Sequence, residues 1–470
     1  MSVTDKKIER VEHRREFIDQ LAESVLPVLA EVHRKDDLSE RFWRRILQPY
    51  FWAIAKRREE YKATKCLVRA TVLPIDGFYL PSRIQSFTAF ARQIMIALER
   101  KSLRRHLSSV GNSEASVSLG RSATSESDEL QSVPLEIDFS KCFLRRRATR
   151  RADIRAAADR ESDPIVKNAL RYLPEVYVEY FESFLVLCRQ IANEFDPTNV
   201  YVEHFPTIFD LFLASYLGER GATIVQLQLG AGAGEVVYPG DSLSQVYYDK
   251  RLTYGWRLND NDVPYYGVRL ELFKRQYDAV KRQGCANDAL LVYNRLSSRE
   301  RKAYYEHCNR LIGENLDRNR YPKLVARPRR FSRKIWMPGG CEIPGIDAVS
   351  GVEVSSGYGP IADLCKTSRV VVHWSHPATN FLECVFVDQP VVAVSPGLEV
   401  TEIFKPFFEF LVEARVLHAK PEHLIEHLNR IEPETWWRGV MNDARYEQFK
   451  ERFARSRVQY QREAREGRHS

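Results

Sequence analysis

The stretch VVVHWSHPATNFLECVFVDQPVVAV, residues 370–394, places two runs of β-branched residues on either side of a short segment. Apolar runs of this composition indicate buried strands, and the segment after Pro377 is typical of a short helix. Strands that follow one another through a helix pair in parallel. The stretch therefore predicts one strand–helix–strand unit of a parallel sheet.

The same alternation recurs on the N-terminal side of this stretch. NVYVEHF (199–205) and TIVQLQLG (223–230) enclose a helical segment, and KRLTYGW (250–256) indicates a third strand. A strand, a helix and a strand within about 30 residues imply a right-handed parallel crossover. Further strands are expected at ALLVYNR (289–295) and KLVARPR (323–329). Such alternation predicts the α/β fold class with doubly wound sheets.

The alternation favours two Rossmann-like domains with a hinge at about 275–287. The N-terminal domain is expected over 1–275, with its Rossmann-like core at about 199–256. The C-terminal domain is expected over 288–430, and a basic helix over 431–470 is expected to follow it. A chain of 470 residues is too long for one ordinary core, which also favours two domains.

Two other segments differ from this pattern. Residues 5–60 have apolar positions at helical spacing, so the chain is expected to start with helices. Residues 108–132 are rich in Ser and Glu and contain few large apolar side chains. Such a stretch buries too little apolar surface to offset its ordering entropy, so a disordered insertion is expected there.

The composition favours a cytoplasmic protein. No run of 18 uncharged apolar residues occurs, and the N-terminus lacks the apolar core of a signal peptide. The eight cysteines form no CxxC pair, so neither a zinc site nor a disulfide framework is expected. No cofactor is expected either.

The formal net charge is +8, with basic clusters at 143–160 and in the C-terminal tail. These clusters are consistent with a solvated helix face, with attraction to anionic lipid or a phosphorylated ligand, or with nucleic-acid binding. No nucleic-acid-binding signature accompanies the charge, so nucleic acid is not expected as a partner. If the basic clusters bind anionic lipid, the protein would associate peripherally with the inner face of a membrane.

The segment HWSHPATN, residues 373–380, lies at the expected carboxyl end of a strand, where α/β sheets bind ligands. The start of the following helix can hold a phosphate through its free N–H groups. Ser375, Thr379 and Asn380 add polar side chains, and Glu383 can accept hydrogen bonds from ribose hydroxyls. Alternatively, Asn380 and Glu383 have the spacing of a capping box, which would be a purely structural role.

Two further residues each admit a structural and a functional interpretation. His376 precedes a proline at a strand end, where a histidine can be structural or can donate a proton to a leaving phosphate. Arg327 follows a predicted strand and can pair with a phosphate or form a surface ion pair.

The glycine-rich segment LGAGAGE, residues 229–235, follows the predicted strand at 223–230. Its spacing is not GxGxxG, and the chain has no GxxxxGK[ST] motif, so an ATP P-loop is excluded. Gln228, Gly230 and Gly232 can form either a flexible loop or a loop that approaches a sugar in a cleft.

The order of several segments resembles a family of bacterial surface-carbohydrate biosynthesis proteins, sugar transferases first named from a leptospiral protein. The resemblance extends over about residues 38–440, and its most specific motifs are the last three. It is carried by RFWRRILQPYFWAIAKRREEY (41–61), ERGATIVQLQLGAGAGEVV (219–237), YYDKRLTYGW (247–256), LVARPR (324–329), HPATNFLECVFVDQPVVAV (376–394) and ETWW (434–437).

The resemblance implies a GT-B architecture, in which two Rossmann-like domains face a cleft. A nucleotide-sugar donor would bind the C-terminal domain and a glycan or glycolipid acceptor the N-terminal one. The family is similar in outline to CDP-glycerol polymerases and capsule Kdo transferases. The donor site would then comprise Arg327, Ser375, His376, Thr379, Asn380 and Glu383.

The chain departs from the family pattern at two positions. Leu229 stands where the family has a histidine, and leucine can neither donate a proton nor bind a phosphate. Glu203, His204 and His376 are the candidates for the catalytic role in its place. Asn380 stands where the family has a second threonine, and its amide can still donate.

The sequence therefore predicts a metal-independent glycosyltransferase that acts on a cell-surface polysaccharide or glycolipid. The absence of a DxD-type motif is the basis for expecting no metal. The alternative is a catalytically altered protein that binds a nucleotide sugar or a glycan in the same cleft.

Overall fold

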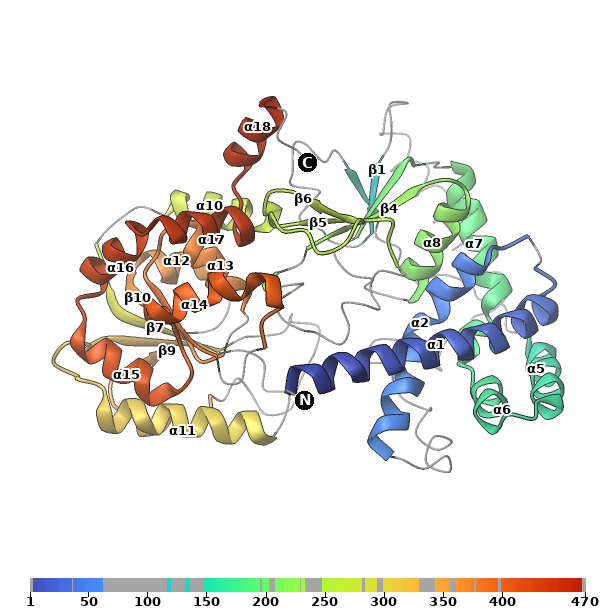
Figure 1. Ribbon diagram of the computed structural model, residues 1–470, viewed down its shortest axis with the longest axis horizontal. Helices are drawn as coiled ribbons and strands as arrows, with labels where there is room; N and C mark the ends of the chain where they lie inside the picture. Colours follow the sequence, from blue (N-terminus) through green and yellow to red (C-terminus); the bar gives the residue numbers. More distant parts are fainter. Residues whose placement is uncertain are drawn as a thin grey trace, which may run out of the picture. The chain divides into compact units, whose positions relative to one another are not determined.

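The fold is described from a computed structural model, shown in Figure 1. The described residues are 3–35, 37–61, 116–119, 132–135, 147–194, 197–202, 208–228, 230–232, 247–280, 284–293, 299–328, 343–355, 360–375, 378–395 and 399–466.

The chain folds into two compact units, and its described strands form two sheets. The first unit contains Met1–Leu227 and Pro239–Arg251, and the second contains Gln228–Tyr238 and Leu252–Ser470. The chain passes from the first to the second within strand β5 (Lys250–Thr253). Residues 275–287, the expected hinge, lie inside the second unit.

The first unit begins with helices, as the apolar spacing indicated. Its helices are α1 (Val3–His33), α2 (Glu40–Tyr61), α5 (Ala148–Arg160), α6 (Pro164–Arg171), α7 (Phe181–Glu194) and α8 (Ile208–Glu219). Aromatic side chains fill the space between α2, α7 and α8. The rings of Trp43 and Phe181 stack with centroids 4.7 Å apart, and Phe42 and Phe212 pack edge-on against Phe181.

The first sheet has the strand order β2-β1-β3-β4-β5-β6. The bounds of these strands are β1 (Ser116–Leu119), β2 (Ser132–Leu135), β3 (Asn199–Val202), β4 (Thr223–Leu227), β5 and β6 (Asp262–Pro264). The pairs β1–β2, β1–β3 and β3–β4 are parallel. The elements β3, α8 and β4 thus form the predicted strand–helix–strand crossover.

The Ser-rich stretch at 108–132 is described only at 116–119 and 132. Residues 116–119 form β1, which differs from the irregular segment that the composition indicated. Parallel pairing with β2 and β3 supplies its backbone hydrogen bonds, and composition alone does not reveal such long-range pairing.

A buried ion pair joins α2 to Asp249, the residue before β5. The guanidinium of Arg45 is almost fully buried, and its Nη2 lies 2.8 Å from Oδ1 of Asp249. Oδ2 of Asp249 accepts a hydrogen bond from the backbone N–H of Ile224 at 2.8 Å. Arg45 and Asp249 belong to two of the segments that resemble the sugar transferase family, so these segments meet in a structural contact.

The second unit contains an all-parallel sheet with the strand order β12-β11-β10-β7-β8-β9. The strands are β7 (Asn287–Tyr293), β8 (Leu324–Pro328), β9 (Val352–Val354), β10 (Ser368–His373), β11 (Val391–Val394) and β12 (Leu417–His418). Numbered in chain order within this sheet, the order is 6-5-4-1-2-3, the order of the doubly wound Rossmann fold. The order reverses between β7 and β10, and ligands of such sheets bind at the carboxyl ends next to this point.

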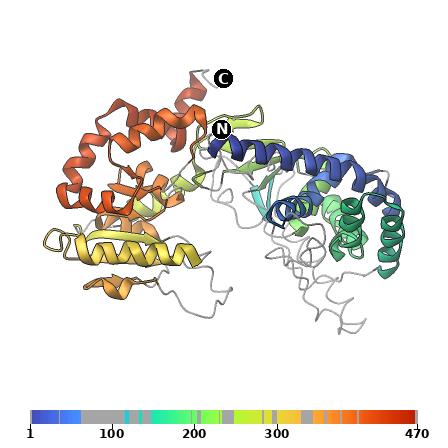
Figure 2. The ribbon, with the colours of Figure 1, turned by 60° about the horizontal axis from the view of Figure 1, so that its bottom comes forward.

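Helices cover both faces of the second sheet, and Figure 2 shows α11 on the side away from α16 and α17. Side chains at alternate strand positions, such as Leu291 and Val372, pack on α11 (Arg299–Asn315) and α15 (Pro421–Arg430). The other alternate positions, such as Val292 and Val371, face the remaining helices. These are α10 (Val268–Ala279), α12 (Ile361–Lys366), α13 (Thr379–Phe386), α14 (Lys405–Glu413), α16 (Pro433–Met441) and α17 (Ala444–Phe453).

The C-terminal tail differs from the single basic helix expected over 431–470. It contains α16, α17 and α18 (Arg457–Arg465). The side chain of Asp443 caps α17 by accepting from the N–H of Arg445. Ser456 and Gln459 form a capping box at the start of α18. Each cap begins a new helix, so the tail bends at these two points.

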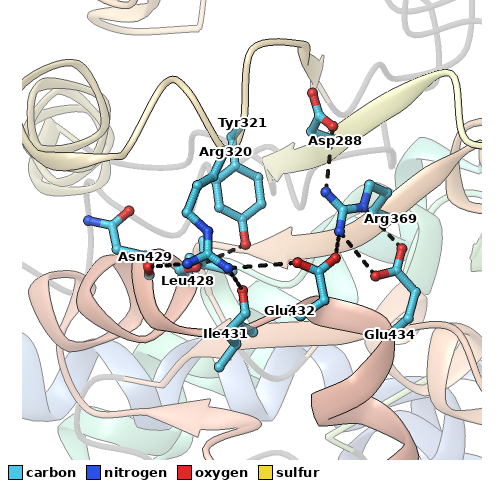
Figure 3. A network of polar contacts seen from close by, with 9 residues as sticks. All are labelled: Asp288, Arg320, Tyr321, Arg369, Leu428, Asn429, Ile431, Glu432 and Glu434. Carbon is cyan, nitrogen blue, oxygen red and sulfur yellow. Dashed lines mark hydrogen bonds and ion pairs between the residues drawn. The ribbon is translucent and has the colours of Figure 1, made fainter.

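A polar network holds the segment between α15 and α16 against the amino ends of the strands (Figure 3). Arg369, on β10, donates to Glu434 at 3.0 Å from its Nε and also contacts Glu432. Arg320 donates to the carbonyl oxygens of Asn429 and Ile431, at 3.0 Å and 2.6 Å. This network lies at the amino ends of the strands, away from the carboxyl ends that carry the candidate site.

In the described part of the chain, no helix is both long and apolar enough to cross a membrane.

Candidate nucleotide site at the start of α13

The candidate site lies at the carboxyl end of β10, next to the point where the strand order of the second sheet reverses. The strand ends at His373, and the chain continues through Trp374 and Ser375 to α13, which starts at Thr379. The cap residue Ala378 provides no side-chain hydrogen bond to the helix. The α13 dipole and the unsatisfied N–H groups of its first turn therefore favour an anion at this position.

The capping-box alternative for Asn380 and Glu383 is wrong. Ala378 is the cap residue, so Asn380 is already inside the first turn of α13. Nδ2 of Asn380 instead donates to Oε2 of Glu383 at 2.8 Å. The two side chains form a pair one helical turn apart.

The carboxylate of Glu383 is nearly enclosed, with only 10% of its side chain exposed. Burial raises its pKa, whereas the hydrogen bond from Asn380 and the charge of Arg269 act in the opposite direction. Nε of Arg269 lies 3.8 Å from Oε1 of Glu383. The site thus holds a carboxylate that has one amide donor and one nearby guanidinium.

Arg269 was not among the residues predicted from the sequence. It lies on α10, far from α13 in the chain, and no motif surrounds it. Its side chain is 44% exposed, so the guanidinium is accessible to a ligand beside the enclosed carboxylate.

The glycine-rich segment meets the start of α13. A Cβ atom on Gly230 would lie 2.0 Å from Oγ1 of Thr379, so only glycine fits there. Gly232 adopts a φ of +94°, which also favours glycine. Both glycines belong to the second unit, like α13. The backbone of this loop therefore approaches the helix start closely.

Gln228 fixes the start of this loop. Its Nε2 donates to the carbonyl oxygen of Gly230 at 2.9 Å, and its Oε1 accepts from the N–H of Tyr254 at 2.8 Å. The side chain is buried and both ends of the amide are engaged. Gln228 therefore shapes the loop from within.

Arg327 and His373 lie on the same face of the second sheet. In the strand register, Val292 of β7 pairs with Arg327 of β8 on one side and with His373 of β10 on the other. Residues paired in parallel strands point to the same face, here the face toward α12 and α13. Arg327 is half-buried, and burial lowers its pKa while Cys365 and Asp363 raise it.

His373 is a second residue that the sequence interpretation missed. It is 1% exposed, and its ring packs edge-on against Phe381 of α13 with centroids 6.4 Å apart. Burial lowers its pKa to about 3, so the ring is neutral at neutral pH. Its position as the last residue of a β-branched strand could have marked it, but a buried strand residue usually serves only in packing.

The other predicted residues are placed as follows. Ser375 is partly buried in the loop between β10 and α13. Glu203, His204 and His376, the catalytic candidates, lie outside the described residues, as does Leu229. Among the described side chains, no group of three or more His, Cys, Asp or Glu residues has an arrangement that could hold a metal ion.

The fold defines the class of the protein as an α/β protein with two Rossmann-like units, the class expected from the sequence. More particularly, the chain belongs to the LIC12162 family of transferases, whose family model matches residues 82–465. No curated protein matches the chain significantly.

Several solved structures resemble the chain at low identity. Anabaena HepE in complex with UDP and glucose has 12% identity and a TM-score of 0.35, over 60% of this chain and 80% of that chain. S. aureus MnaA with UDP has 12% identity and a TM-score of 0.38, over 74% and 91%. A glycosyltransferase from Rickettsia africae has 10% identity and a TM-score of 0.34, over 79% and 93%.

Proposed function

We propose that the protein is a glycosyltransferase that transfers a sugar from a nucleotide-activated donor to a cell-surface polysaccharide or glycolipid. One observation carries the proposal. The start of α13, whose cap residue Ala378 makes no side-chain hydrogen bond to the helix, lies at the reversal point of a Rossmann-ordered sheet, with a buried carboxylate one turn further along. A diphosphate at the helix start and a ribose at the carboxylate match these two features. The membership in a transferase family supports the same reaction class.

The phosphate contacts in this proposal come mainly from the backbone. The side-chain amide of Asn380 donates to Glu383, so phosphate oxygens would meet the N–H groups of the first turn and the hydroxyl of Thr379. Ser375 would add a second hydroxyl from the preceding loop. Because a side chain at position 230 would occupy this space, the glycine loop lets its backbone approach the phosphates.

Two arginines would supply positive charge. Arg327 shares a face of the sheet with His373, and its half-buried guanidinium would lie toward the leaving diphosphate. Arg269 would contact the donor beside Glu383, because almost half of its side chain is exposed. Fixed positive groups and a helix dipole stabilise the charge that develops on a leaving phosphate.

Glu383 would bind the ribose rather than transfer protons. Its carboxylate would accept hydrogen bonds from ribose hydroxyls, and Asn380 and Arg269 favour its ionised form against the effect of burial. His376, Glu203 and His204 are proposed for proton transfer, with His376 nearest to α13 in the chain. The acceptor, a glycan or glycolipid, is proposed to bind the first unit. Association with an anionic membrane surface through basic segments would bring the protein to a glycolipid acceptor.

The test is the affinity for nucleotides. Isothermal titration with UDP, CDP, GDP and CMP identifies the preferred nucleotide, and Glu383→Gln should then weaken its binding about ten- to a hundredfold, because a charge-assisted hydrogen bond is lost. Glu409→Gln on the exposed side of α14 removes the same charge and should leave the affinity unchanged. Equal affinities of wild type and Glu383→Gln would exclude the ribose role.

A second candidate function is nucleotide-sugar or glycan binding without transfer. Leu229, at the position where the resemblance implies a histidine, is the observation that favours it. The wild-type protein would then bind the preferred nucleotide sugar and leave it intact in the presence of acceptor glycans. Turnover that is lost in His376→Ala or His204→Ala, with binding retained, would favour the transferase.

A further inference from the structure

His373 has a polar ring in a place where an apolar side chain would pack as well. The residue is 1% exposed, and among the described residues neither ring nitrogen finds a hydrogen-bond partner of good geometry. A buried polar group without a partner is costly, and such a group calls for an explanation. Its neighbours on α13 include Phe381, which contacts the ring, and Asn380.

Asn380 is the polar residue next to Phe381 in the first turn of α13, and the ring of Phe381 packs edge-on against His373. An interaction with the Asn380 side chain also raises the pKa of His373, against the larger effect of burial. The ring nitrogens nevertheless fall outside hydrogen-bond geometry, so the two groups are near each other without a formed bond. Because functional hydrogen bonds are often long or poorly aligned in the absence of ligand, a side-chain adjustment would complete this one.

The orientation of the Asn380 amide decides whether its N–H group or its oxygen faces the carboxylate of Glu383. With Nδ2 on Oε2 of Glu383 at 2.8 Å, the amide donates to the carboxylate. Turned over, the amide would present its oxygen to the carboxylate and repel it. Oδ1 now faces the thiols of Cys365 and Cys384, at 3.9 Å and 4.0 Å, and thiols are weak donors. A stronger hydrogen-bond donor to Oδ1 is therefore needed to fix the orientation of the Asn380 amide.

We infer that His373 is a positioning residue whose ring N–H donates to Oδ1 of Asn380 and so holds Nδ2 of Asn380 on the Glu383 carboxylate. A neutral imidazole has one N–H donor, which is what this role requires. The chain of contacts runs from the end of β10 through the first turn of α13 to the proposed ribose site. Only its consequence for nucleotide binding rests on the proposed function.

The experiment measures the proton affinity of Glu383 in the ligand-free protein. The chain is labelled with ¹³C at the Glu carboxyl carbons, and the signal that disappears in Glu383→Gln is assigned to Glu383. In His373→Leu the amide loses its restraint, and the proton affinity of Glu383 should rise about threefold to tenfold, as expected for one lost hydrogen bond. His373→Gln, which keeps a side-chain N–H, should restore the wild-type titration.

His427→Leu is the matched control. His427 is also a buried histidine whose two ring nitrogens have no hydrogen-bond partner in the part of the chain that the structure describes, but it lies on α15, which covers the other face of the sheet. The titration of Glu383 should be the same in this variant as in the wild type. An unchanged titration in His373→Leu, a loss in His373→Gln equal to that in His373→Leu, or a shift in His427→Leu would each overturn the inference.

Two further measurements cover the remaining outcomes. If His373→Leu does not fold, the ring N–H of His373 in ¹⁵N-histidine-labelled wild type should give an exchange-protected signal that is lost in Asn380→Ala, and an unprotected signal in the wild type would contradict the inference. Nucleotide titration of the same variants separates the two proposals. A shifted Glu383 titration in a protein that binds no nucleotide would retain the positioning role and remove the donor site.

Discussion

Gly230 and Thr379 lie so close together that a Cβ on Gly230 would be 2.0 Å from Oγ1 and 3.1 Å from Cβ of Thr379. The loop after β4 and the start of α13 are far apart in the chain, yet they belong to the same compact unit. A requirement for glycine at position 230 thus comes from a neighbouring helix and not from the backbone conformation of the loop.

Gly230→Ala should therefore displace the loop from the start of α13. The added methyl group would overlap the side chain and Cβ of Thr379, and we expect a loss of about 1–3 kcal/mol of stability, as for other overpacked sites. If the site binds a nucleotide, its affinity should fall as well. Chemical denaturation and nucleotide titration measure the two effects.

Gly439 provides the control for this substitution. It lies in α16, and no atom would approach an added Cβ within 4 Å. Gly439→Ala should be neutral or stabilise the protein by up to about 1 kcal/mol, because alanine favours the helix. Combining Gly230→Ala with Thr379→Ala should recover part of the stability, since Oγ1 and Cγ2 are removed. No recovery would show that the clash with Thr379 is not the cause.

Buried histidines should make the second unit sensitive to acid. Burial lowers the pKa of His373 and His427 to about 3 and that of His418 to about 4. In the unfolded chain these groups take up protons near pH 6.5, whereas in the folded chain they stay neutral. Stability should therefore fall as the pH decreases from about 6.5 toward 4, by up to about 1.4 kcal/mol per pH unit for each histidine.

Denaturation curves at several pH values between 4 and 7.5 test this expectation. His427→Leu should reduce the slope of stability against pH, because one of the three groups no longer titrates. His307→Leu is the control, since His307 lies near the surface beside Glu422 with its side chain 37% exposed. A pH dependence that is the same in His427→Leu and in the wild type would contradict the assignment.

Much of the second sheet could be predicted from the sequence because its strands are buried on both faces. Strands β7, β8, β10 and β11 appear in the sequence as runs rich in β-branched and other apolar residues. Such runs can be recognised as strands without knowing which strands lie beside them. The bends in the tail could have been found as well, since Asp443 and Ser456 are ordinary helix-capping residues.

Only some residues of the candidate site could be predicted from the sequence. Asn380 and Glu383 are local in sequence, so their pairing within one helical turn could be anticipated, although not which group would donate. Arg269 comes from a distant helix, and His373 looks like a strand residue until the strand register places it beside Val292. Such contacts arise from tertiary packing, which the spacing of residues along the chain does not encode.

The network around Arg369 should contribute measurably to stability. Arg369 joins β10 to Glu432 and Glu434 at the start of α16, and Asp288 lies 3.9 Å from its Nη1 (Figure 3). Because its side chain is 24% exposed, solvent screens part of this interaction, and Arg369→Ala should cost about 1–2 kcal/mol. The loss should decrease at high salt. Arg430→Ala, which removes an exposed pair within α15, should change the stability by less than about 0.5 kcal/mol.

The pair of Arg45 and Asp249 should contribute strongly to the stability of the first unit. Arg45 is 2% exposed and lies 2.8 Å from Asp249, and burial lowers its pKa to about 10. Asp249→Asn would remove the carboxylate charge that faces the buried guanidinium of Arg45 and the exposed guanidinium of Arg41, so we expect a loss of about 3 kcal/mol. Asp249 also accepts from the N–H of Ile224, and this bond to the start of β4 would weaken.

Chemical denaturation of Asp249→Asn measures this loss, and Asp260→Asn at a fully exposed carboxylate serves as the control. Replacing both partners, as in Arg45→Met with Asp249→Asn, should recover stability, since the buried guanidinium charge is then removed as well. A double variant as unstable as the sum of the two single variants would show that the residues act independently. Arg41 also pairs with Asp249, so the cycle measures the coupling of Arg45 to Asp249 alone between the two segments that resemble the transferase family.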